Sequence, residues 1–121
     1  MDPDLDALAS HQTIAITTIG RKTGRRRRIE IWWFRVDGRF IITGTPGRRD
    51  WLANVKADPR IVVHVDGSDL DATASIVDDM TLRRTVFTRQ QTSWYSSQAE
   101  LDHLVATAPM IEVHFVEAAR A

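Results

Sequence analysis

The amino-acid sequence predicts a mainly β fold, in which about six antiparallel strands form a barrel with two to three helices at its periphery. Two strong hairpin signals, Asp37-Gly38 and Asp66-Gly67-Ser68, stand between segments rich in β-branched and aromatic residues. No strand–helix–strand alternation of the kind that builds a parallel doubly wound sheet runs through the chain. The length suits one domain, so residues 1–121 are expected to form a single unit.

The predicted elements follow from hydrophobic patterning and from the residues that interrupt it. Strands are expected at residues 12–19, 27–36, 39–44, 60–66, 70–77 and 110–117. Helices are expected at about 49–57, 80–90 and 97–106, and residues 4–10 are a further short candidate.

Three local signals place the ends of these helices. Asp58-Pro59 ends the first, because the residue before a proline avoids the helical region. Asp78 or Asp79 is expected to cap the helix that begins near residue 80. Ser97 and Glu100 have capping-box spacing and predict the start of the last helix.

The second predicted strand carries bulky side chains on both faces, which is typical of a barrel wall or of a contact between subunits. Its alternation predicts one face with Ile29, Ile31 and Trp33 and another with Glu30, Trp32 and Phe34. We interpret the aromatic run as core or dimer contact, and it is one basis for expecting a homodimer. Glu30 lies in an apolar setting, where a carboxylate needs a partner, and a neighbouring arginine would suffice. A general-base role for Glu30 is the alternative.

Charge is unevenly distributed although the formal net charge is zero. Residues 21–60 hold twelve Lys/Arg against four Asp/Glu, whereas residues 61–121 hold four against nine. Fourteen of the sixteen cations are arginines, whose planar fork suits phosphate and carboxylate. This asymmetry predicts one face that meets an anion. The zero net charge and the acidic second half argue against nucleic acid as the partner.

A basic loop at residues 20–28 is the main candidate site. It places six cations in eight residues: Arg21, Lys22, Arg25, Arg26, Arg27 and Arg28. Gly20 and Gly24 let backbone N–H groups approach a phosphate, and Thr23 adds a hydroxyl. The alternative is a solvated hairpin tip. Neither a Walker A motif nor the GxGxxG dinucleotide fingerprint is present.

A second candidate segment joins the third strand to the first long helix. It contains Gly44, Thr45, Pro46 and Gly47 and leads into Trp51 and Asn54. The helix start offers unpaired N–H groups and the positive end of the helix dipole to an anion or to an electron-rich ring edge. For Trp51 the alternatives are stacking on a cofactor ring and packing in the core, and we favour core packing. Asn54 is either a buried orienting group or a surface residue.

The remaining residues limit the chemistry further. Tyr95 is a weak candidate proton donor beside Trp94, with a hydrophobic plug as the alternative. The four histidines lack ligand spacing, so no metal site is expected. The chain has no cysteine, which excludes thiolate catalysis and is consistent with a cytoplasmic location. No apolar stretch is long enough to span a bilayer, and no secretory signal is recognisable.

Residues 13–66 resemble the deazaflavin-dependent nitroreductase family, also called F420-dependent quinone reductases. Members of that family commonly read TTxGRKSG or TTxGRKTG, followed by an arginine-containing strand and a W-x-x-N helix that ends in ADP or ANP. The matching residues here are Thr17-Thr18-Ile19-Gly20-Arg21-Lys22-Thr23-Gly24, Arg27, Trp51-Leu52-Ala53-Asn54 and Ala57-Asp58-Pro59. The tyrosine-rich substrate region of the nitroreductases has no counterpart beyond Tyr95.

The resemblance implies a split β-barrel similar to the FMN-binding pyridoxamine-phosphate-oxidase fold. It implies coenzyme F420, with the phosphate near Arg21, Lys22, Thr23 and Arg27 and the ring near Gly44 to Gly47 and Trp51. It further implies reduction of quinones, nitro compounds or activated double bonds by hydride from the reduced cofactor. The alternatives are a split-barrel protein that binds FMN, FAD or haem, one that binds a cofactor without turnover, and a nucleic-acid binder.

Overall fold

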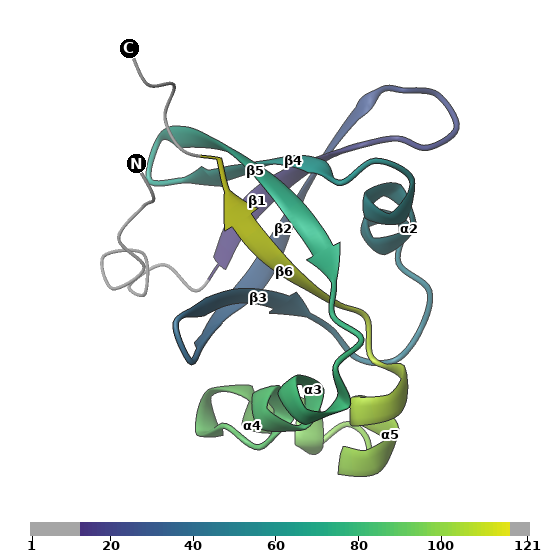
Figure 1. The fold of residues 1–121 in the computed structure, drawn as a ribbon, viewed down its shortest axis with the longest axis vertical. Coiled ribbons are helices and arrows are strands. Elements are labelled where there is room, and N and C mark those ends of the chain that lie inside the picture. The colour runs from purple at the N-terminus through teal and green to yellow at the C-terminus, as the bar shows by residue number, and fades with distance from the viewer. Residues whose placement is uncertain (1–12, 117–121) are drawn as a thin grey trace.

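The structure, a computed structural model, describes residues 13–116 and contains a closed six-stranded barrel. Its strands are β1 (Thr13–Ile19), β2 (Arg26–Val36), β3 (Arg39–Thr43), β4 (Arg60–Val65), β5 (Ser68–Ile76) and β6 (Met110–Phe115). Its helices are α2 (Asp50–Ala57), α3 (Met80–Phe87), η1 (Gln90–Thr92), α4 (Ser93–Ser96) and α5 (Leu101–Thr107). In Figure 1, α2 lies beside one flank of the barrel, and α3, α4 and α5 gather at one end.

The barrel closes in the order β1-β2-β3-β6-β5-β4, with every neighbouring pair antiparallel. The long strand β2 is shared between two parts of the sheet. Residues 26–32 pair with β1, whereas residues 33–36 pair with β3. The β1–β2 hairpin extends past the barrel on the side where α2 lies (Figure 1). This extension is what positions the candidate site.

Two hydrophobic clusters stabilise the fold. One fills the barrel and contains Ile16, Trp33, Val63 and Trp51 from α2. The other lies between the barrel wall and the helices α3 to α5, and it contains Phe34, Phe87 and Tyr95 among others. Because consecutive residues of a strand point to opposite faces, β2 supplies Trp33 to the first cluster and Phe34 to the second.

The six predicted strands are confirmed, with ends shifted by one or two residues. Both hairpin turns have the left-handed backbone that Asp-Gly favours, with φ values of 50° and 76° at Asp37 and Gly38. Asp79 caps α3, because its carboxylate accepts hydrogen bonds from the backbone N–H groups of Thr81 and Leu82. The helix expected over residues 4–10 lies outside the described residues.

The prediction that Ser97 and Glu100 form a capping box at the start of the last helix is wrong. Ser97 ends α4 instead of starting α5, and its hydroxyl donates to the backbone carbonyl of Trp94. The N-cap of α5 is Glu100, whose side chain makes no capping bond.

The expectation that Glu30 needs a partner is also corrected. Its side chain faces outward and is exposed, so burial does not require a partner for it.

The aromatic run of β2 divides between core and surface. Trp33 and Phe34 are buried within their own chain, which confirms the core interpretation for both. Trp32 stays 40% exposed and makes an edge-to-face contact with Trp94 of α4, at a ring-centroid distance of 5.9 Å. Most of the aromatic area that suggested a subunit contact is therefore used inside the protomer.

Candidate functional site

A groove of about 470 Å³ opens between the β1–β2 hairpin and α2. The hairpin supplies its cationic side, and α2 supplies an aromatic and two polar side chains. The residues that line it are Thr18, Gly20, Arg21, Lys22, Thr23, Arg27, Arg28, Ile29, Asp50, Trp51 and Asn54. The groove thus combines a basic rim with an apolar wall formed by Ile29 and Trp51.

The basic loop is closed tightly at its base by backbone hydrogen bonds. The Gly20 N–H donates to the Arg25 carbonyl at 2.7 Å, and the Gly24 N–H donates to the Gly20 carbonyl at 2.8 Å. Gly24 has a φ of 70°, which a residue with a Cβ rarely adopts. A Cβ at Gly20 would lie 3.0 Å from the Arg25 carbonyl oxygen. Both glycines are therefore required by the shape of the loop.

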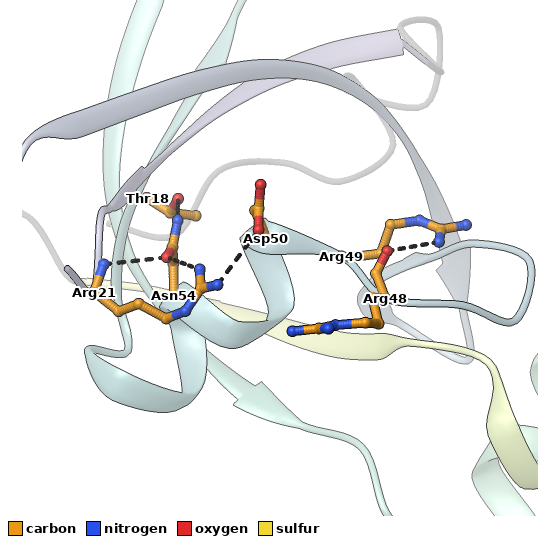
Figure 2. A network of polar contacts seen from close by, with 6 residues as sticks. All are labelled: Thr18, Arg21, Arg48, Arg49, Asp50 and Asn54. Carbon is orange, nitrogen blue, oxygen red and sulfur yellow. Dashed lines mark hydrogen bonds and ion pairs between the residues drawn. The ribbon is translucent and has the colours of Figure 1, made fainter.

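Asn54 connects the loop to the barrel. Its Oδ1 accepts from the Arg21 backbone N–H at 3.2 Å and from Arg21 Nη1 at 3.0 Å. Its Nδ2 donates to Thr18 Oγ1 at 3.1 Å, and both residues are buried. Figure 2 shows Asn54 between Thr18 and Arg21, with the Arg21 side chain running along α2 towards Asp50. The loop is thus anchored at Arg21 by a buried amide, while residues 21–28 stay exposed to solvent.

The cations of the groove fall into two groups. Arg21 is committed to Asn54 and, at 3.5 Å, to the exposed Asp50 carboxylate. Lys22, Arg27 and Arg28 form no ion pair with any residue that the structure describes. Within the same range, no acceptor bonds the backbone N–H groups of Lys22 and Thr23. This arrangement can bind an anionic group such as a phosphate.

The structure brings six of the sequence-predicted site residues to this one groove: Arg21, Lys22, Thr23, Arg27, Trp51 and Asn54. Trp51 is also 7% exposed and belongs to the barrel core, so the favoured core interpretation is confirmed. Gly24 shapes the loop but does not line the groove. Arg28, a cation of the predicted basic loop, lines the groove as well. Sequence reasoning missed Thr18, Ile29 and Asp50 as site residues, although Ile29 follows from strand alternation, since it lies two residues from Arg27.

The segment Gly44 to Gly47 does not line the groove. It is organised internally by Arg49, whose Nη2 donates to the Thr45 carbonyl at 2.9 Å and to Thr45 Oγ1 at 3.1 Å. Arg49 Nη1 donates to the Arg48 carbonyl at 3.0 Å (Figure 2). A role for Gly44, Thr45, Pro46 and Gly47 at the cofactor ring stays a prediction.

Tyr95 lies in the second hydrophobic cluster and does not line the groove. Its ring makes edge contacts with Phe34, Phe87 and Trp94. Burial raises the pKa of the Tyr95 phenol from its ordinary value, and Arg49 acts in the opposite direction. The phenol is thus protonated at neutral pH, but its position favours the hydrophobic plug. Among the described residues no group of three or more His, Cys, Asp or Glu could hold a metal.

Replacing Asn54 with alanine is expected to loosen the basic loop. The substitution removes the acceptor of two Arg21 bonds and leaves the buried Thr18 hydroxyl without its donor, so we expect a loss of about 2 kcal/mol in unfolding free energy. We also expect amide exchange at residues 20–25 to accelerate at least tenfold, measured by hydrogen–deuterium exchange. Lys56→Ala, at an exposed position of the same helix, is the matched control. Unchanged loop exchange in Asn54→Ala would contradict the anchoring role.

Comparison with known proteins supports the fold and identifies a family. The model of the F420H(2)-dependent quinone reductase family matches residues 6–108. Three similar solved structures are a domain-swapped dimer, an F420-H2 dependent reductase, and a pyridoxinephosphate oxidase family protein from Clostridium acetobutylicum. The first two are each 19% identical to this chain, with a TM-score of 0.63. Each match covers 86% of this chain; it covers 81% of the domain-swapped dimer chain and 95% of the reductase chain. The third is 15% identical with a TM-score of 0.68, covering 92% of this chain and 80% of its own.

These likenesses confirm the split-barrel fold that the sequence predicts. No helix among the described residues is long and apolar enough to cross a membrane.

Proposed function

The chain belongs to the F420H(2)-dependent quinone reductase family, and from this membership we propose that it is a reductase that binds coenzyme F420 in the groove beside α2. The observation that carries the proposal is the convergence of the basic loop, Arg27 and Trp51 on one groove. The substrates that follow are quinones first, then nitro compounds or other activated double bonds. A homodimer is part of the proposal, supported by the domain-swapped dimer among the similar folds.

The residues present fit a phosphorylated tricyclic cofactor. Lys22 and Arg27 offer positive charge that the described residues do not neutralise, and the Lys22 and Thr23 N–H groups can donate to phosphate oxygens. Ile29 and Trp51 offer apolar and aromatic surface to a ring system. A cofactor with an anionic tail and an aromatic head needs this combination of a basic rim and an apolar wall.

When bound, F420H2 supplies the hydride, so the protein needs no nucleophile of its own. The contribution of this chain is placement and electrostatics. Lys22 and Arg27 hold the anionic end, and Asn54 fixes the loop so that this grip has one geometry. The Arg21 guanidinium also lies 3.5 Å from the exposed Asp50 carboxylate. Because this network is assembled before the cofactor arrives, little ordering remains to oppose binding.

The function is tested by titrating the purified protein with F420, FMN, FAD and haem in parallel. Trp51 lines the groove, so quenching of tryptophan fluorescence by the bound ring reports occupancy. We expect micromolar affinity for F420 and at least tenfold weaker binding of the other three. Turnover of a quinone by F420H2 completes the test. Preferential binding of FMN, FAD or haem would keep the fold and reject the cofactor assignment, and F420 binding without turnover would reject the reductase.

A further inference from the structure

A second cavity, of about 350 Å³, opens on the outer face of the sheet formed by β2, β1, β4 and β5. It shares no lining residue with the cofactor groove. Arg27 and Arg28 line the groove, whereas Arg26 lines this outer cavity. The basic run therefore serves two surfaces, and the proposed function uses only one of them. The four strands lie side by side in Figure 1.

The ladder registers show how the cavity is built. Ile19 pairs with Arg26 on one side, and continuing the β1–β4 register places Arg60 on its other side. The next outward-facing row runs from Arg28, which lines the groove, through Thr17 and Val62 to Asp71. These residues pair in sequence across β2, β1, β4 and β5. This row lies two residues further along the strands, roughly 6.8 Å away. Ile19 and Val62 form an apolar floor with cations at one end and oxygen acceptors at the other.

The two arginines at the cationic end differ in availability. Arg60 is held by Asp58, which accepts from its Nε at 3.0 Å and from its Nη2 at 2.7 Å. That contact lowers the pKa of the Asp58 carboxyl to about 2, so the pair remains ionic at neutral pH. No hydrogen bond or ion pair joins the Arg26 side chain to any residue between 13 and 116. Arg26 is thus the cation that can bind a ligand.

The acceptor end contains an oriented hydroxyl. Thr17 Oγ1 lies 2.6 Å from His64 Nε2, and His64 Nδ1 lies 2.6 Å from Asp69 Oδ1. The hydrogen bond from His64 lowers the pKa of the Asp69 carboxyl, which is therefore an acceptor at neutral pH. The His64 ring thus bridges Asp69 and the Thr17 hydroxyl and orients that hydroxyl. The Thr17 oxygen keeps at least one lone pair for a ligand that donates a hydrogen bond, and Asp71 provides a second acceptor.

We propose that this outer cavity binds a small carboxylate with a flat apolar body and a hydroxyl at its far end, of the hydroxyaryl carboxylate class. The carboxylate pairs with Arg26, the ring lies on Ile19 and Val62, and the hydroxyl donates to Thr17 or Asp71. The cavity is within the size range of small-molecule sites and has their usual composition, an apolar surface with a few convergent polar groups. The site is independent of the F420 groove.

The test uses 4-hydroxybenzoate as the probe, with benzoate and 4-hydroxybenzyl alcohol as matched analogues that each lack one polar end. Calorimetry of the wild-type chain is expected to show saturable binding of 4-hydroxybenzoate and at least fivefold weaker binding of either analogue. Amide shifts in a two-dimensional NMR spectrum are expected at Thr17, Ile19 and Val62. Absence of saturable binding, or shifts centred on the basic loop, would overturn the proposal.

Two variants assign the contacts. Arg26→Gln is expected to weaken 4-hydroxybenzoate at least tenfold, whereas Arg25→Gln, which lines neither cavity, should leave its affinity within twofold. Thr17→Val keeps the side-chain shape and is expected to reduce the preference for 4-hydroxybenzoate over benzoate while benzoate still binds. Equal effects of Arg26→Gln and Arg25→Gln would reject the site. F420 affinity measured on the same samples separates this outcome from a failure of the reductase assignment.

Discussion

Replacing Arg83 with methionine is expected to lower the free energy of unfolding by about 3 kcal/mol or more. Arg83 lies in α3, is 5% exposed, and donates to three backbone carbonyls: those of Val77, Val105 and Ala108. A buried charge can often be replaced by an apolar group of similar size without loss when its partners are replaced too. Here the partners are main-chain carbonyls, which no side-chain substitution removes. The three carbonyls would lose their donors, so the substitution is expected to be destabilising.

The measurement is urea unfolding of Arg83→Met beside Arg84→Met. Arg84 is the next residue of the same helix, and its partner is the exposed Asp102, so its replacement should cost less than about 1 kcal/mol. Arg83→Lys keeps the charge but lacks the planar guanidinium that reaches three acceptors. Its loss of unfolding free energy should lie between those of Arg83→Met and Arg84→Met. Equal midpoints for Arg83→Met and Arg84→Met would show that the three carbonyls are satisfied in some other way.

The double substitution Arg21→Ala/Lys22→Ala is expected to weaken F420 binding at least tenfold, about 1.4 kcal/mol. Two effects contribute. Replacing Lys22 removes a positive charge that the described residues do not neutralise. Replacing Arg21 removes the contacts to Asn54 and Asp50 that order the loop. The barrel core does not include either side chain, so the protein should remain folded. Fluorescence titration at low and high salt measures the affinity and its electrostatic part.

The matched control for this variant is Arg25→Ala/Arg26→Ala. It removes the same net charge from the same hairpin, but neither residue lines the groove. If long-range attraction alone drives binding, the two double variants should have equal affinity for F420. If Arg21 and Lys22 form the site, Arg21→Ala/Lys22→Ala should bind F420 several-fold more weakly than the control variant. Equal affinities would therefore reject the loop as the phosphate site, even if both variants bind less tightly than the wild type.

Local sequence signals were sufficient for the strands and hairpins. The two Asp-Gly turns and the alternation around Trp33 follow from backbone conformation and strand period, which act over a few residues. The helices near residues 88–101 were harder. Thr88, Thr92 and Ser97 donate side-chain hydrogen bonds to nearby carbonyls and divide this region into short segments. The spacing of Ser97 and Glu100 cannot reveal that competition.

The site was predictable in its residue types but not in its connections. Glycines and cations in one short loop indicate an anion site, and the structure gathers most of them at the groove. The bond between Arg21 and Asn54 joins residues 33 positions apart, and the Arg83 contacts join α3 to the end of α5. Such contacts depend on packing of distant segments, which no local pattern encodes. The outer cavity likewise depends on the register of four strands.

Barrel closure also has a consequence for the order of folding. β6 is the last described strand in the chain and pairs with both β3 and β5, so that Phe40 and Ala74 flank Val113. Until β6 is inserted, β3 and β5 remain open edges of an incomplete sheet and expose the side chains that fill the barrel. Contacts so distant in sequence give a high contact order and slow folding. During synthesis the basic hairpin leaves the ribosome early, yet the edges of β3 and β5 can pair with other chains until β6 has emerged.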